Sequence, residues 1–184
     1  MKIAFTGASG TGKTSVANKL VRSEFGVTNG LSIVSVDSRS LLSSLGLGLA
    51  NNISSSGYRV FQTMYLSRKV AFEASADNYI VERSYADCLA YWRIHCEETA
   101  SDEENFIIDQ LCKEKIKTYN MHFLFPTDFL ELENDGFRHT NPEYHRNFED
   151  VLKDILMECK IDPWIMPGLS IDRRTEFMIK SIHA

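Results

Sequence analysis

Eight residues near the start of the chain constrain its fold more than any other segment. Residues 7–14 read Gly-Ala-Ser-Gly-Thr-Gly-Lys-Thr, which fits the pattern G-x-x-x-x-G-K-[ST]. A short apolar segment that favours a strand, Lys2–Thr6, precedes them, and residues 15–21 carry apolar side chains at helical spacing. Strand, glycine-rich loop and helix is the order in which this motif binds phosphate groups. The sequence therefore predicts a site for a nucleoside triphosphate.

Each part of this phosphate loop (residues 7–14) has a physical role. Glycine adopts backbone angles that other residues rarely adopt, so the loop amides can approach phosphate oxygens closely. The N-terminus of the following helix adds a partial positive charge. We expect Lys13 to reach the β- and γ-phosphates of ATP and the Thr14 hydroxyl to ligate Mg²⁺. The predicted nucleotide-binding residues here are Gly7, Ala8, Ser9, Gly10, Thr11, Gly12, Lys13, Thr14 and Ser15.

Composition narrows the class of protein and its location. The net charge of −5 argues against a general binder of nucleic acid, although a local basic pocket for phosphates is compatible with it. No apolar run approaches the roughly 20 residues of a membrane span, and the first apolar strand leads directly into the phosphate loop rather than into a signal-peptide cleavage site. The four cysteines form no C-x-x-C and no metal-ligand spacing with histidine. We expect a reduced, cytoplasmic protein without a structural metal.

The rest of the chain alternates between strand and helix patterns. Strands are predicted at 31–36, 78–82, 121–125 and 161–166, and helices at 58–76, 85–96, 101–112, 142–159 and 171–182. Ser101 and Glu104 have the spacing of a capping box, and the helix that they open is expected to bury Ile107. This order predicts an α/β fold of the P-loop NTPase type, a three-layer sandwich with a parallel sheet of about five strands and helices on both faces.

Two further segments are expected to act around a ligand. Residues 43–57 are rich in Ser, Gly and Asn, which is typical of a loop that closes over a substrate or of a plain surface linker. A short lid is expected at about residues 127–146. We interpret residues 1–184 as a single P-loop domain, for which a homodimer is one expected state.

Three classes of protein share the phosphate loop: GTPase switches, mechanical ATPases and small-molecule kinases. A GTPase would carry N/T-K-x-D and D-x-x-G, and neither string occurs in the sequence. A mechanical ATPase of the AAA+ type would have an apolar strand ending in Asp-Glu, with more chain for a helical lid domain. Here the third strand ends in Val81-Glu82-Arg83-Ser84, which favours a kinase.

This last segment carries a specific resemblance. Glu82-Arg83-Ser84 resembles the E-R-S motif of deoxynucleoside kinases and the D-R motif of thymidylate kinases and of nicotinamide riboside kinase domains. The run Phe61-Gln62, Arg68, Glu73, Glu82-Arg83-Ser84, Asp87 and Tyr91 is similar to a pattern of the last group, small ATPase/kinase proteins common in bacteria and their phages. Asp135-Gly136-Phe137-Arg138 resembles the D-G-x-R that opens the lid in that group, and Arg146 follows at the spacing of lid arginines.

The resemblance implies roles for the charged residues. Arg83, just past the carboxyl end of a strand, would bind phosphate or the acceptor; the alternative is an ion pair with Asp87 on a helix surface. Glu82 would hold Mg²⁺ through water, unless it is a solvated strand terminus. Arg138 and Arg146 would close over the triphosphate as lid arginines, unless they are merely solvated.

The acceptor side is predicted less specifically. Asp37 follows the second strand, where deoxynucleoside kinases keep the carboxylate that accepts the proton of an alcohol acceptor; its alternative role is a helix cap. Gln62 would bind a base edge, with Phe61 or Tyr65 stacking on the base, although aromatics at helical spacing are more often core residues. Gly168 and Ser170 follow the last strand, where related kinases wrap backbone around adenine, and Arg173 would stack there.

The leading expectation is Mg·ATP-dependent phosphoryl transfer to a nucleoside or nucleoside monophosphate, with a deoxynucleotide kinase preferred. Three alternatives stay open. They are a nicotinamide riboside kinase, a kinase acting on a modified base in DNA, which the acidic net charge disfavours, and a regulatory ATPase that hydrolyses or senses the nucleotide.

Overall fold

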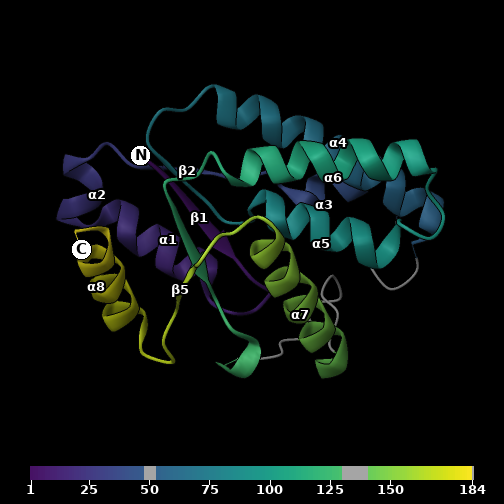
Figure 1. The fold of residues 1–184 in the computed structure, drawn as a ribbon. Helices are drawn as coiled ribbons and strands as arrows, with labels where there is room; N and C mark the ends of the chain where they lie inside the picture. The colour runs from purple at the N-terminus through teal and green to yellow at the C-terminus, as the bar shows by residue number, and fades with distance from the viewer. Residues whose placement is uncertain (48–52, 130–140, 184) are drawn as a thin grey trace.

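The chain folds around one five-stranded parallel sheet (Figure 1). The computed structural model describes residues 1–47, 53–129 and 141–183. The strands lie in the order β2-β3-β1-β4-β5, and every neighbouring pair is parallel. Their bounds are Lys2–Thr6 (β1), Ser32–Val34 (β2), Tyr79–Val81 (β3), Met121–Leu124 (β4) and Trp164–Ile165 (β5). The predicted all-parallel α/β sheet is confirmed.

Helices cover both faces of this sheet (Figure 1). In chain order they are α1 (Lys13–Arg22), α2 (Glu24–Thr28), α3 (Ser38–Ser44), α4 (Ser55–Ala74), α5 (Tyr85–His95), α6 (Asp102–Ile116), the 3-10 helix η2 (Thr127–Phe129), α7 (Pro142–Glu158) and α8 (Ile171–Ile182). Helices α1 and α8 pack together on one side, and α5 packs against α4, α6 and α7 on the other. Ser101 and Glu104 form the predicted capping box at α6.

Alternation along β1 divides the core into two layers. Ile3 and Phe5 belong to the apolar cluster that includes residues of α1 and α8, whereas Ala4 belongs to the cluster formed with α4, α5 and α7. Successive side chains of a strand point to opposite faces, so a strand buried on both faces carries apolar residues continuously. This explains why Ile3, Ala4 and Phe5 of β1 and all three residues of β3 are apolar and buried.

The edge strands are shorter than predicted. Strand β2 pairs only with the three-residue β3, from Ser32 opposite Tyr79 to Val34 opposite Val81. Strand β5 pairs only with Phe123 and Leu124. The length of an edge strand depends on its partner, and the apolar pattern of 31–36 or 161–166 contains no information about that partner.

The predicted 43–57 loop is also shorter in the structure. Residues 43–44 end α3, and residues 55–57 begin α4, because the Ser54 hydroxyl accepts the Gly57 N–H at 3.2 Å as an N-cap. Serine serves such caps well, so its abundance here indicates a helix start as much as a loop. Residues 48–52 and residues 130–140 of the predicted lid lie outside the described part of the chain.

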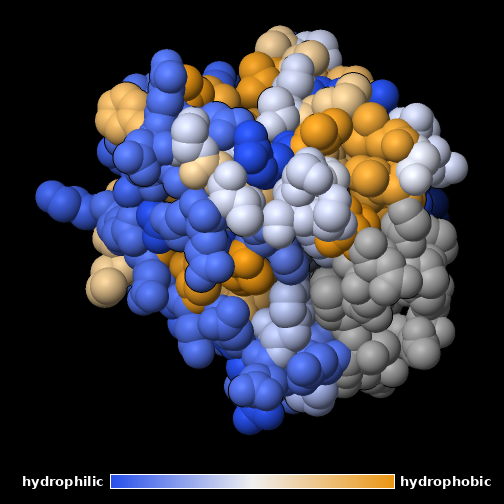
Figure 2. Space-filling view, turned by 90° about the vertical axis from the view of Figure 1, so that its right-hand side faces the viewer, coloured by the Kyte–Doolittle hydropathy of each residue, from blue (hydrophilic) through white to orange (hydrophobic). Residues whose placement is uncertain are grey.

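Several apolar side chains lie on the surface. The space-filling view shows orange apolar groups among blue polar ones on the side that it faces (Figure 2). Ile107 is 53% exposed, so its predicted burial is wrong, and Met64 and Phe72 of α4 are exposed as well. Phe61 and Tyr65 of the same helix are buried. Within the described residues, no helix combines the length and apolar character that a membrane crossing requires.

Candidate active site

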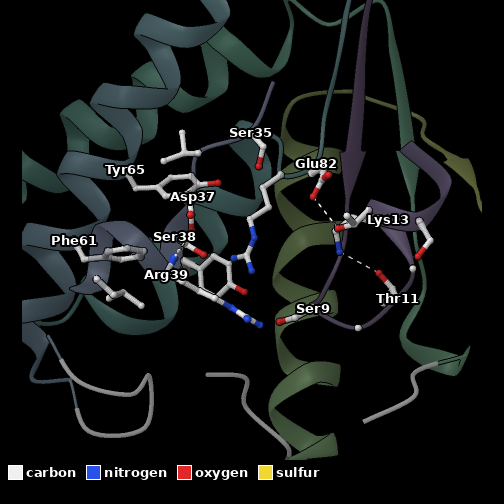
Figure 3. Close-up of a pocket in the computed structure, with 18 of the residues that line it drawn as sticks. Ser9, Thr11, Lys13, Ser35, Asp37, Ser38, Arg39, Phe61, Tyr65 and Glu82 are labelled. Atoms are coloured by element: carbon white, nitrogen blue, oxygen red, sulfur yellow. Dashed lines mark hydrogen bonds between the residues drawn. The ribbon is translucent and has the colours of Figure 1, made fainter. Parts of the chain in front are cut away.

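A cavity of about 870 Å³ opens at the carboxyl ends of the central strands. Parallel strands all end at the same edge of a sheet, so the loops that follow them converge there. The lining comes from the phosphate loop, the turn after β2, α4, the turn after β3 and the start of α8. In Figure 3, Ser9, Thr11 and Lys13 face Asp37, Phe61 and Tyr65 across this space.

The phosphate loop adopts the backbone that its glycines were expected to permit. Gly7 has a φ of 141° and Gly12 a φ of 87°, both in the region that side chains disfavour. A Cβ on Gly7 would lie 2.5 Å from the Phe125 carbonyl oxygen, so substitution there would push the loop away from β4. Residues 9–15 line the cavity, whereas Gly7 and Ala8 are buried and are not among the described lining residues.

Lys13 is folded back over its own loop. Its ammonium donates to the Gly7 carbonyl at 2.7 Å, to the Thr11 hydroxyl at 3.1 Å and to the Ala8 carbonyl. The side chain is only 7% exposed, yet Lys13 contributes to the cavity wall. The ammonium is therefore held against the phosphate loop, in a side chain that lines the cavity.

Thr14 and Glu82 meet across the cavity floor. The Thr14 hydroxyl donates to the Glu82 carboxylate over 2.8 Å, although 68 residues separate them in sequence. A hydroxyl and a carboxylate oxygen side by side, next to a phosphate loop, are the donors that Mg²⁺ takes together with waters and substrate phosphates. The residues present thus fit the metal that the sequence predicted at Thr14 and Glu82.

Asp87 connects the phosphate loop to the β3–α5 turn (residues 82–84). Its carboxylate accepts the Ser84 N–H at 2.7 Å and the Ser84 hydroxyl at 2.9 Å through Oδ2, and the Gly7 N–H at 3.0 Å through Oδ1. The Thr6 hydroxyl also donates to the Ser84 oxygen at 2.7 Å. All of these groups are buried, so the two loops are fixed relative to one another by interactions that water does not weaken.

Arg83 lines the cavity beside an aromatic ring. Its guanidinium carbon lies 5.2 Å from the centre of the Tyr91 ring. Tyr91 raises the pKa of Arg83, while burial acts in the opposite direction. The alternative of a surface ion pair with Asp87 does not describe this site, because Asp87 is buried and bonded to Gly7 and Ser84.

Asp37 caps α3 and lines the cavity. Its carboxylate accepts the Arg39 and Ser40 backbone N–H groups at 3.0 and 3.1 Å and the Ser40 hydroxyl at 2.6 Å. These bonds, that of the Ser40 hydroxyl foremost, lower the pKa of Asp37. The cap that the sequence offered as an alternative is therefore present, and it keeps the carboxylate ionised at the cavity wall.

The wall opposite the phosphate loop is largely aromatic. Phe61, Gln62 and Tyr65 are buried on α4 and line the cavity, so they belong to the core and to the site at once. Burial raises the pKa of Tyr65, so its hydroxyl stays protonated. Tyr58 and Tyr91 extend this wall.

The C-terminal segment contributes a different arginine from the one expected. Arg174 lines the cavity and donates to the Thr11 carbonyl at 3.0 Å, whereas Arg173 is exposed. One residue along a helix turns a side chain by about 100°, so the neighbouring position faces elsewhere. Ser170 lines the cavity with Leu169 and Ile171, while Gly168 is not among the lining residues described.

Of the two predicted lid arginines, only Arg146 belongs to the described residues, and it is not found at the cavity. Arg146 lies on the exposed side of α7, where its Nε is 3.5 Å from the Pro142 carbonyl, and it is not among the described lining residues. Arg138 lies outside the described residues. The lining residues that sequence reasoning left out of the site include Arg39, Tyr58, Leu169, Ile171 and Arg174. Arg39 directly follows the expected Asp37 and could have been found from that position; Arg174 has no local signal.

The loop, the parallel sheet and the cavity at its carboxyl edge define a P-loop α/β nucleotide-binding fold. A family model described as an AAA domain matches residues 2–174, and the chain belongs to this family. That description names no substrate. No curated protein sequence matches the chain significantly.

Solved structures, two of them of kinases, share the fold at low sequence identity. NadR in complex with NR is 19% identical to this chain and superposes with a TM-score of 0.67 over 99% of it. The chain spans only 50% of the length of that NadR chain. Deoxyadenosine kinase from M. mycoides with bound products is 12% identical, with a TM-score of 0.71 over 100% of this chain and 98% of that one. Thymidylate kinase from Ehrlichia chaffeensis is 19% identical, with a TM-score of 0.62 over 99% and 98%.

Proposed function

We propose that the chain transfers the γ-phosphoryl group of Mg·ATP to a nucleoside or nucleoside monophosphate, with a deoxynucleotide as the preferred acceptor. One observation carries the proposal. A single cavity has the phosphate loop on one wall and, on the opposite wall, a carboxylate, two arginines and an aromatic surface. A switch that only hydrolyses ATP needs no such second wall.

The nucleotide side of the cavity suits a triphosphate. The amides of residues 9–15 and the N-terminus of α1 would bind the phosphate oxygens. The Lys13 ammonium would exchange its bonds to the Gly7 and Ala8 carbonyls for bonds to the β- and γ-phosphates. Leu169 and Ile171 at the rim offer apolar contacts for a base.

The acceptor side suits a ring with an attached oxygen nucleophile. Phe61 and Tyr65 would pack against a base, and the Gln62 amide would hydrogen-bond its edge. In the reaction, the acceptor oxygen forms a bond to the γ-phosphorus while the bond from that phosphorus to the β–γ bridging oxygen breaks and ADP leaves. An alcohol acceptor would release its proton to the Asp37 carboxylate; a monophosphate acceptor is already ionised.

Positioning and charge neutralisation supply most of the catalysis in phosphoryl transfer. Arg83 would bind the acceptor or the transferred group, since its side chain lines the cavity next to Glu82. Thr14 and Glu82 would hold Mg²⁺, which neutralises charge on the β- and γ-phosphate oxygens when bound. Arg138 and Arg146 stay proposals for a lid.

A turnover assay with a panel of acceptors tests the proposal. Purified protein with Mg·ATP is given deoxynucleosides, deoxynucleoside monophosphates, nicotinamide riboside and an oligonucleotide, and ADP and phosphorylated product are both measured. NadR shares the fold, so nicotinamide riboside belongs in the panel. We expect ADP formation that depends on one acceptor class and is matched by product. ADP formation that no acceptor changes would replace the kinase by an ATPase switch.

A further inference from the structure

A buried ion pair lies next to the β3–α5 turn, and neither of its residues is among the described lining residues of the cavity. The Lys69 ammonium lies 2.6 Å from the Glu73 carboxylate one helical turn along α4. It also donates to the backbone carbonyl of Arg83 at 2.5 Å and lies 4.8 Å from the centre of the Tyr85 ring. Lys69 is 1% exposed and Glu73 is 7% exposed, so both charges are removed from water.

The carboxylate of this pair is fully occupied by buried donors. Glu73 accepts the Tyr79 hydroxyl at 3.0 Å through one oxygen and the Tyr119 hydroxyl at 2.9 Å through the other. Burial and the Glu73 charge raise the pKa of Tyr79, so its hydroxyl remains a donor. The network thus joins α4 to β3 and to the segment before β4.

Such a pair is poorly explained by stability alone. Removing two charges from water is unfavourable, and buried ion pairs can often be replaced by apolar residues of similar volume without loss of stability. An apolar pair could reproduce neither the two tyrosine bonds to Glu73 nor the bond from Lys69 to the Arg83 carbonyl, and of these only the last reaches the β3–α5 turn. This carbonyl lies just beyond the last paired residue of β3, Val81, where the sheet no longer supplies a hydrogen-bond partner.

We infer that Lys69 is a positioning residue, which fixes the backbone of the β3–α5 turn so that Glu82 and Arg83 project into the cavity. Asp87 holds the same peptide unit from its other side, because its carboxylate accepts the Ser84 N–H. With both polar groups of the peptide between Arg83 and Ser84 fixed, Glu82 is directed at the Thr14 hydroxyl and Arg83 at the Tyr91 ring. The effect of Lys69 on turnover rests on the proposed phosphoryl transfer; its effect on the turn does not.

The test separates positioning from stability with a pair of variants. Lys69→Met leaves the Glu73 charge buried without its partner and should lower the melting temperature. The double variant Lys69→Met/Glu73→Gln removes both charges, so we expect it to recover most of that temperature while the Arg83 carbonyl still lacks its donor. Lys113→Met, which breaks a helix ion pair with Asp109 outside the cavity lining, is the matched control.

The first readout is hydrogen exchange, which needs no activity. Loss of a hydrogen bond to a charged group should speed exchange of the amides in the β3–α5 turn by roughly tenfold or more in the double variant, with the β4 amides unchanged. Exchange in the turn equal to that of the wild type would overturn the inference.

The second readout is turnover with the acceptor found for the wild type. We expect the double variant to lose roughly tenfold or more in kcat and to need more Mg²⁺ for half-maximal rate, whereas Lys113→Met behaves as the wild type. Recovery of kcat together with the melting temperature would show a merely structural pair and overturn the inference. A wild type that transfers to no acceptor would instead remove the proposed function, and the exchange measurement would still decide the role of Lys69.

Discussion

The carboxylate of Asp87 accepts the backbone N–H of Gly7 at 3.0 Å, so a buried side chain of α5 fixes the first residue of the phosphate loop. The same carboxylate caps α5 through Ser84. A single side chain thereby sets the distance between the triphosphate side of the cavity and the turn that carries Glu82 and Arg83.

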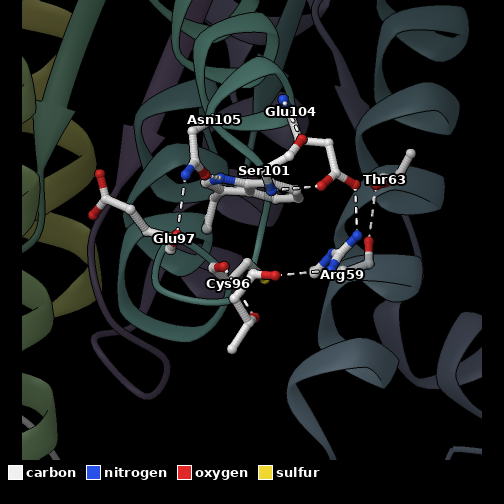
Figure 4. A network of polar contacts seen from close by, with 9 residues as sticks. Arg59, Thr63, Cys96, Glu97, Ser101, Glu104 and Asn105 are labelled. Atoms are coloured by element: carbon white, nitrogen blue, oxygen red, sulfur yellow. Dashed lines mark hydrogen bonds and ion pairs between the residues drawn. The ribbon is translucent and has the colours of Figure 1, made fainter.

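Asp87→Ala should destabilise the protein by about 2–4 kcal/mol, because the donors of Gly7 and Ser84 would be buried without an acceptor. The measurement is the free energy of unfolding from denaturant titration. Glu104→Ala is the matched control: Glu104 has the same position in the capping box of α6 but lies in the exposed network with Arg59 and Ser101 (Figure 4). We expect a much smaller loss of stability from this change, because the Glu104 carboxylate is exposed to water. Equal losses in the two variants would contradict the special role of Asp87.

Thr14→Val should raise the Mg²⁺ concentration for half-maximal turnover by roughly tenfold or more, because the hydroxyl beside Glu82 is lost. Thr14→Ser keeps the hydroxyl and should stay close to the wild type. Glu82→Gln should shift the Mg²⁺ dependence in the same direction as Thr14→Val. Steady-state rates against Mg²⁺ concentration at saturating ATP check all three, and an unchanged Mg²⁺ dependence in Thr14→Val would remove the metal from this position.

Asp37→Asn distinguishes the two kinds of acceptor. If Asp37 accepts the proton of an alcohol, the change should lower kcat for a nucleoside by about 10²- to 10⁴-fold and kcat for a monophosphate by far less. Asparagine can still accept the Arg39 and Ser40 N–H groups, so the cap of α3 is largely kept. Equal losses with both acceptors would leave Asp37 as a cap only.

His122 makes stability depend on pH. The ring is buried on β4, and burial lowers its pKa from 6.5 to about 4, against a smaller opposing effect of the Ile116 carbonyl. Between these values the unfolded chain binds a proton that the folded chain does not, so stability should fall as the pH drops from about 6.5 to about 4, by at most about 3 kcal/mol. The free energy of unfolding, obtained from denaturant titrations at several pH values, should depend less steeply on pH in His122→Leu than in the wild type. The same pH dependence in both proteins would contradict this role of His122.

The sequence predicts the fold wherever the signal is local. Residues 2–22 combine a strand, a glycine-rich loop and an amphipathic helix, and each limits the others, so β1 and the phosphate loop were predicted closely. The edge strands β2 and β5 were predicted too long, because their extent is set by partners far away in the chain.

The candidate site likewise contains some residues that the sequence predicted and others that only the structure reveals. Thr14 and Glu82 were predicted from separate motifs and do meet in space. The sequence did not predict the contact of Lys69. A lysine in a helix with both polar and apolar residues does not indicate that its ammonium reaches the carbonyl of Arg83, 14 residues later. Likewise, Arg173 and Arg174 cannot be told apart until the orientation of α8 on α1 is known.

Calorimetric titration with a non-hydrolysable ATP analogue and Mg²⁺ measures whether the phosphate loop binds a nucleoside triphosphate. We expect saturable one-to-one binding by the wild type, weakened by roughly tenfold or more in Lys13→Ala while the melting temperature of the unliganded protein stays within a few degrees. Absence of binding heat from the folded wild type at several temperatures, or equal affinity in Lys13→Ala, would contradict binding of ATP at residues 7–14.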